Sequence, residues 1–131
     1  MILPAAKPIH LDTDLLIRAL VPNSPEADKL RGWLEDRRTI AMSALAWEEF
    51  LCGPLDDLAQ ALARRIGSRH LPVGTDEAAE AARLFNLVGR RQGSFPDYKI
   101  AATAILAGAE LARANLSDFK PFLEAGLRLA K

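Results

Sequence analysis

Short apolar segments alternate with longer segments of helical periodicity along this chain, and that alternation constrains its fold more than any other feature. Residues 8–11 predict a buried strand that ends at Asp12, and residues 39–42 predict a second short strand. Between them, the apolar positions of residues 25–34 recur at helical spacing. Later extended segments are predicted over residues 71–73, 110–114 and 127–129. The alternation predicts an α/β fold, a three-layer α/β/α sandwich with a small, mostly parallel central sheet.

Capping side chains indicate where the predicted helices begin and end. A hydroxyl or carboxylate that precedes an apolar helical segment accepts a backbone N–H of the first turn. The residues predicted to do so are Asp14, Ser24, Ser43 and Thr75. Pro96 suits the first turn of a helix over residues 97–106, which Gly108 is expected to end.

The composition favours one folded domain over residues 1–131, since 50% of the residues are hydrophobic and 26% are charged. No apolar run reaches the roughly 20 residues that span a bilayer, and the first residues lack the pattern of a signal peptide. We therefore expect a cytoplasmic protein with no membrane contact. The single cysteine, Cys52, excludes an intramolecular disulfide and is expected to be a small buried apolar residue.

Four acidic residues occupy comparable places in this layout, namely Asp12, Glu49, Asp97 and Asp118. Taken singly, each has an ordinary structural role at a helix N-terminus, on a helix surface or in a turn. Together they are expected at one edge of the sheet, because parallel strands share a direction and open α/β sheets bind ligands at their carboxyl ends. Carboxylates gathered there would raise one another's pKa unless a cation lay among them. Oxygen ligands without His or Cys suit Mg²⁺ or Mn²⁺.

The histidines do not extend this candidate site. Neither His10 nor His70 has a partner at metal-ligand spacing, so packing in a strand or a place on the surface is expected for both. The chain also has no Ser–His or Cys–His arrangement that would activate a side-chain nucleophile.

The sequence around the four carboxylates resembles the conserved blocks of PIN-domain ribonucleases. Four segments carry the resemblance in the family's order: residues 11–17 (LDTDLLI), 43–53 (SALAWEEFLCG), 95–104 (FPDYKIAATA) and 115–119 (NLSDF). In the second block a Glu stands four residues before a Gly, which selects Glu49 over Glu48. The chain length is similar to that of VapC-type toxins from bacterial toxin–antitoxin pairs.

The resemblance implies a PIN-like domain and a metal-dependent RNA endonuclease that hydrolyses phosphodiester bonds. The four carboxylates would be its catalytic residues and would hold Mg²⁺ or Mn²⁺. It also implies an RNA substrate, a small antitoxin encoded nearby and a homodimer. Without these four residues the chain has 13 acidic against 17 basic side chains, which fits a surface that binds RNA around an acidic centre.

Three further residues are expected to support the carboxylates. Asp14 stands where the family commonly has a small polar residue or Asp, and it would either support the metal site or simply cap a helix. Asn115 begins the fourth block. Arg113 stands where the family often has Thr or Ser, so its guanidinium is expected near Asp12 or Asp118. There it would replace a metal charge or clamp the scissile phosphate; a side chain that bends out to solvent is the third possibility.

Two other functions remain open from the sequence. Asp12-Thr13-Asp14 resembles the opening of haloacid-dehalogenase-like phosphatases, although no Gly-Asp-x-x-x-Asp follows downstream. A catalytically inactive PIN-like module that binds other proteins is the second alternative. Apolar helix residues are expected to serve partly as core and partly as partner surface: Trp33, Leu34, Trp47, Phe50 and Leu51.

Overall fold

A five-stranded parallel sheet lies at the centre of the computed structural model, which describes residues 6–53, 56–66, 69–88, 95–115 and 119–131. The strands are β1 (Ile9–Leu11), β2 (Ile40–Ser43), β3 (Arg69–Leu71), β4 (Glu110–Ala112) and β5 (Arg128–Leu129). They lie in the order β3-β2-β1-β4-β5, and every neighbouring pair is parallel. The predicted parallel sheet is therefore confirmed.

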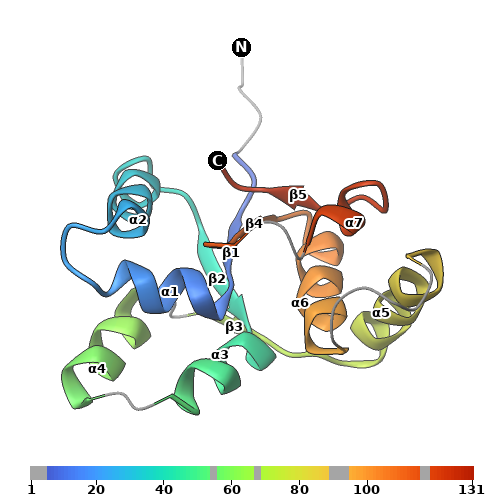
Figure 1. The fold of residues 1–131 in the computed structure, drawn as a ribbon, viewed down its shortest axis with the longest axis horizontal. Coiled ribbons are helices and arrows are strands. Elements are labelled where there is room, and N and C mark those ends of the chain that lie inside the picture. The colour runs from blue at the N-terminus through green and yellow to red at the C-terminus, as the bar shows by residue number, and fades with distance from the viewer. Residues whose placement is uncertain (1–5, 54–55, 67–68, 89–94, 116–118) are drawn as a thin grey trace.

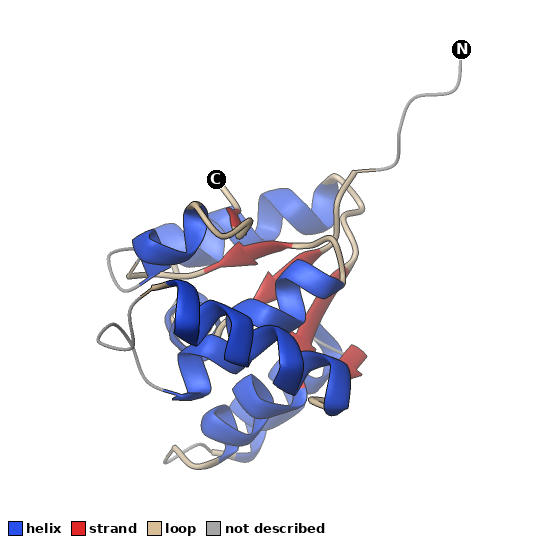
Figure 2. Cartoon of the chain, turned by 90° about the vertical axis from the view of Figure 1, so that its right-hand side faces the viewer, coloured by secondary structure: helices blue, strands red, loops and turns tan. Residues whose placement is uncertain are grey.

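Helices cover both faces of this sheet. Those of the described residues are α1 (Thr13–Ala19), α2 (Pro25–Glu35), α3 (Ala44–Leu51), α4 (Asp57–Ile66), α5 (Thr75–Leu87), α6 (Phe95–Leu106) and α7 (Lys120–Leu123). Figure 1 shows α1, α2 and α4 on one side of the strands and α5, α6 and α7 on the other. In the view of Figure 2 the strands run through the middle of the molecule between helices. The three-layer α/β/α sandwich predicted from the sequence is confirmed.

The strand order places a switch point between β1 and β4. From β1 the chain continues to β2 and β3 on one side, and it then crosses to β4 and β5 on the other side. Leu11 pairs with Ala112 at the carboxyl ends of β1 and β4. Ligands of open α/β sheets bind in the crevice outside the carboxyl ends at such a point. The next residues of these two strands, Asp12 and Arg113, therefore stand at the position where a site is expected.

The packing of α6 brings another part of the chain to this edge. Its middle is buried on all sides, and small residues such as Ala101, Ala102 and Ala104 let the helix approach the sheet closely. Its C-terminus ends at Gly108, whose φ of 64° is the left-handed conformation typical of a helix C-terminus. Because α6 is fixed in this way, its first turn, which carries Asp97, is held beside the strand ends.

Two predicted caps are wrong, and the reason is local hydrogen bonding. The N-cap of α1 is Asp12, whose carboxylate accepts the N–H of Thr13 at 2.8 Å, so Asp14 lies inside the first turn. The N-cap of α5 is Gly74, because its N–H donates to the carboxylate of Glu77 at 2.8 Å. Thr75 is consequently the first residue of α5 rather than its cap. The caps predicted at Ser24 and Ser43 are confirmed.

Several segment boundaries also differ from the prediction. Strand β3 covers Arg69–Leu71 and ends before Pro72, which has no N–H to donate to a neighbouring strand. Strand β4 ends at Ala112, and the N–H groups of Ala114 and Asn115 beyond it bond to the Asp14 carboxylate rather than to a strand. The short helix α7 was not predicted, and α6 begins at Phe95 rather than at Asp97.

Burial corrects one further expectation and supports two others. Cys52 is exposed, because it lies at the C-terminal end of α3 rather than in the core. His10 is buried in the middle of β1, and His70 stacks on Trp47 with ring centroids 4.4 Å apart. None of the helices in the described part of the chain is long and apolar enough to cross a membrane.

Candidate active site

Asp12 is the most buried carboxylate at the carboxyl edge of the sheet, with 3% of its surface exposed. Its backbone N–H donates to the carbonyl of Ala112 at 2.9 Å, which continues the β1–β4 pairing by one residue. Its side chain caps α1, so both the strand and the helix fix its position. Burial raises the pKa of Asp12 to about 6, although the Arg113 guanidinium opposes that rise. The carboxylates of Asp14 and Glu49 raise it further.

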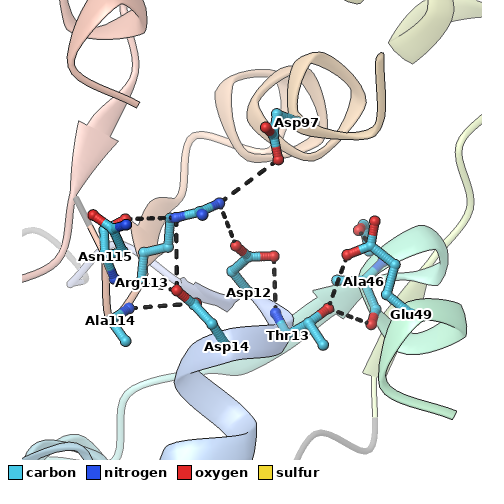
Figure 3. A network of polar contacts seen from close by, with 10 residues as sticks. Asp12, Thr13, Asp14, Ala46, Glu49, Asp97, Arg113, Ala114 and Asn115 are labelled. Atoms are coloured by element: carbon cyan, nitrogen blue, oxygen red, sulfur yellow. Dashed lines mark hydrogen bonds and ion pairs between the residues drawn. The ribbon is translucent and has the colours of Figure 1, made fainter. Parts of the chain in front are cut away.

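Arg113 enters the site from the end of β4, as its position in the sequence predicted. Figure 3 shows its guanidinium between Asp97 and Asp12. Nη1 donates to Oδ2 of Asp12 at 2.6 Å and lies 3.7 Å from Oδ1 of Asp97. Nε lies 3.8 Å from Oδ2 of Asp14 and donates to the carbonyl of Asn115 at 2.6 Å. The prediction that this side chain lies beside Asp12 is confirmed, and a side chain extended into solvent is excluded.

Glu49 reaches the site from α3, on the other side of Asp12. Its carboxylate oxygen Oε2 lies 3.3 Å from the hydroxyl oxygen of Thr13. Burial raises the pKa of Glu49, the Thr13 hydrogen bond opposes the rise, and the charge of Asp97 adds to it. Glu49 is therefore electrostatically coupled to both Asp12 and Asp97.

Asp14 supports the segment that follows β4. Its two carboxylate oxygens accept the backbone N–H groups of Ala114 at 3.3 Å and Asn115 at 3.1 Å. These two donors would otherwise be unpaired where the strand ends. Asp14 thus holds the backbone next to Arg113 against the first turn of α1 (Figure 3).

Sequence reasoning overlooked two residues at this site. The first is Thr13, whose hydroxyl lies 2.8 Å from the carbonyl oxygen of Ala46 and also contacts Glu49. Its position directly after Asp12, at the start of a helix, is the signal that could have identified it. The second is Phe119, whose ring lies under the Arg113 guanidinium with its centroid 4.1 Å from Cζ. Phe119 is the last residue of the fourth block, but no sequence pattern predicts a stacking partner.

The donor set has the chemistry of a site for a hard divalent cation. Asp12, Asp14, Glu49 and Asp97 supply four carboxylates against the one guanidinium of Arg113, a formal charge of −3. Oxygen-only ligands fit Mg²⁺ or Mn²⁺, as do the pKa values of Asp12 and Glu49, which burial and then neighbouring carboxylates raise. Yet no three His, Cys, Asp or Glu side chains of the described residues are grouped closely enough to hold a metal ion in the present arrangement. Asp118, the fourth predicted carboxylate, lies outside the described residues.

Comparison with known protein families identifies one family that matches this chain. The family model described as PIN domain matches residues 9–120. No curated protein sequence matches the chain significantly.

Solved structures resemble the fold over almost its whole length. VapBC2 from Rickettsia felis, bound to a DNA fragment from its promoter, gives a TM-score of 0.74 at 19% identity, covering 93% of this chain and 96% of that one. FitAcB from Neisseria gonorrhoeae gives 0.70 at 21% identity, covering 94% and 96%. VapC20 from Mycobacterium tuberculosis, a toxin that cleaves the sarcin–ricin loop, gives 0.66 at 16% identity, covering 93% and 98%. At these identities the likeness establishes the fold alone.

Proposed function

Because the chain belongs to the PIN-domain family, we propose that it is a single-domain, metal-dependent RNA endonuclease that hydrolyses phosphodiester bonds. The observation that carries the proposal is the meeting of Asp12, Glu49 and Asp97 at the switch point of the sheet. These carboxylates come from three separate segments, and their charges act on one another. A fold that only needed stability would gain little from bringing like charges together.

In this proposal Asp12, Glu49 and Asp97, together with Asp118, hold Mg²⁺ or Mn²⁺. When bound, such an ion lowers the pKa of a water molecule and neutralises charge on the phosphodiester. The protein's own part is to position the carboxylates. Asp12 is fixed by strand and helix together, and the Thr13 hydroxyl orients Glu49.

The proposed substrate is RNA. VapC20, which shares the fold, is a toxin that cleaves the sarcin–ricin loop. Arg64, Arg65 and Arg69 are exposed at the end of α4 and in β3, so they are available for backbone phosphates. Arg90 and Arg91 lie outside the described residues. The PIN-domain match favours this nuclease over the phosphatase that Asp12-Thr13-Asp14 also resembles.

We further propose that the protein is the toxin of a toxin–antitoxin pair, that it acts in the cytoplasm as a homodimer, and that a small antitoxin encoded nearby binds it. VapBC2, which shares the fold, is a complex bound to promoter DNA. Leu34 and Leu51 are exposed on α2 and α3 and offer apolar surface for a partner, whereas Trp33 and Phe50 are buried in the core.

The test is RNA cleavage by purified wild-type protein and by Asp12→Asn and Asp97→Asn, with Mg²⁺, with Mn²⁺ and with EDTA. We expect cleavage only with a divalent ion and a loss of at least about 100-fold in each variant, because metal catalysis is worth several kcal/mol. Asp28→Asn is the matched control, since Asp28 is an exposed carboxylate on α2 that pairs with Arg31. Cleavage by Asp97→Asn at the wild-type rate would overturn the assignment. Mn²⁺ binding without RNA cleavage would favour the inactive protein-binding module.

A further inference from the structure

Arg113 is a cation in a site that is otherwise formed by carboxylates, and it has no role as a metal ligand. It directly follows Ala112, and Ala112 pairs with Leu11 in the sheet, so Arg113 and Asp12 leave neighbouring strands at the same level. The register therefore brings a residue with a permanently charged side chain beside the most buried carboxylate of this edge. An arginine in this setting cannot avoid the charge by losing its proton.

The guanidinium is aimed at carboxylates rather than at solvent. Nη1 bonds to Asp12 at 2.6 Å and lies 3.7 Å from Asp97, two of the residues that the proposed function assigns to the metal. Only 11% of the Arg113 side chain is exposed. A substrate phosphate that approached the site would find these donors already engaged.

Two further contacts hold the guanidinium in this position. Nε donates to the Asn115 carbonyl at 2.6 Å, and Cζ of the guanidinium lies over the Phe119 ring, 4.1 Å from its centroid. Stacking on an aromatic face suits the planar, weakly hydrated guanidinium. Carboxylates, a backbone carbonyl and an aromatic ring thus hold Arg113 in the site.

We propose that Arg113 is a resident cation that competes with a divalent metal ion for Asp12 and Asp97, so that the ion binds only when the guanidinium withdraws. The inference rests on the proposed function, because it takes these two carboxylates as metal ligands. The positive charge stabilises the crowded carboxylates while no metal is bound, and it lowers the affinity of the site for the metal.

The decisive measurement is the Mn²⁺ affinity of the full-length, metal-free protein by isothermal titration calorimetry. We expect Arg113→Thr to bind Mn²⁺ at least about tenfold more tightly than wild type, because a nearby repelling charge is gone. Mn²⁺ should also raise the melting temperature more in this variant, since tighter binding to the folded state stabilises it more. Arg31→Thr is the control: it removes an exposed arginine on α2, and its Mn²⁺ affinity should equal that of wild type.

Arg113→Met keeps a long apolar side chain over Phe119 but removes the charge, and it replaces Arg113→Thr if the threonine variant does not fold. We expect it to bind Mn²⁺ more tightly by the same factor. Equal Mn²⁺ affinity in wild type and in the Arg113 variants overturns the inference and leaves the proposed function standing. Equal affinity with weaker RNA binding also overturns it, and assigns Arg113 to the substrate phosphate. Absence of Mn²⁺ binding in all of these proteins overturns both proposals.

Discussion

The Thr13 hydroxyl oxygen lies 3.3 Å from Oε2 of Glu49 and so connects the first residue of α1 to α3. The same hydroxyl lies 2.8 Å from the carbonyl oxygen of Ala46, one turn earlier in α3. Thr13 also gives its backbone N–H to Asp12. One residue thereby contacts two of the proposed metal ligands.

Thr13→Val is expected to lower RNA cleavage about tenfold, because Glu49 loses the hydrogen bond that orients it and misplaced catalytic groups are costly. Stability should fall by about 1 kcal/mol, the usual worth of one hydrogen bond. Cleavage rates and urea unfolding check both expectations. Thr13→Ser retains the hydroxyl and should recover most of the activity. Equal loss in the serine and valine variants would show that the hydroxyl does not act on Glu49.

Asp12→Asn should leave the metal-free protein at least as stable as wild type at pH 7. The pKa of Asp12 is about 6 in the folded protein, above its ordinary value of 3.8, so the folded state holds this proton more tightly than the unfolded chain does. Ionisation of Asp12 therefore lowers the stability of the folded protein as the pH rises. The cost develops between about pH 4 and pH 6 and amounts to at most about 3 kcal/mol. Chemical denaturation from pH 4 to 8 in EDTA measures the difference. A variant that is clearly less stable than wild type at pH 7 would mean that the Arg113 ion pair outweighs the burial of Asp12.

His10 should make the protein less stable on acidification. Burial, with help from the charge of Arg69, lowers the pKa of His10 from 6.5 to about 4, so the unfolded chain binds a proton that the folded protein does not. Stability from this group is complete above pH 6.5 and declines by up to about 3 kcal/mol toward pH 4. His10→Leu should lose this contribution, so that its stability rises on acidification from about pH 6 to pH 4, where the opposite contribution of Asp12 remains.

His10 and Asp12 act in opposite directions over this pH range. Wild type should therefore show a nearly flat stability between about pH 4 and 6, while Asp12→Asn should lose stability on acidification. If the stability of His10→Leu depended on pH in the same way as that of wild type, the lowered pKa of His10 would be contradicted.

Much of the fold follows from local sequence pattern, but some helix and strand ends depend on contacts between distant parts of the chain. The caps at Ser24 and Ser43 were predictable, because a hydroxyl before an apolar helix bonds to the N–H three residues later. The choice between Asp12 and Asp14 was not, since it depends on where β1 ends against β4. The N–H of Ala114, just past the end of β4, bonds to Asp14, which lies a hundred residues away in the chain.

The candidate site, like the fold, could be predicted only in part from the sequence. The end of the first predicted strand was enough to place Asp12 at the carboxyl edge of the sheet. The place of Arg113 beside it was expected only from the family resemblance, and the register of β1 and β4 accounts for it. The direction of the guanidinium depends on the Asn115 carbonyl and the Phe119 ring, and these tertiary contacts have no sequence signature. The role of Asp118 stays a prediction.

The central claim is that the carboxylates at the β1–β4 switch point bind a divalent cation. Anomalous diffraction from crystals grown with Mn²⁺ tests it most directly, because the ion itself is located. We predict an anomalous peak coordinated by Asp12 and Asp97, with the Arg113 guanidinium no longer bonded to Asp12. Mn²⁺ bound only elsewhere on the protein, with the pair of Arg113 and Asp12 intact at 2.6 Å, would contradict the account.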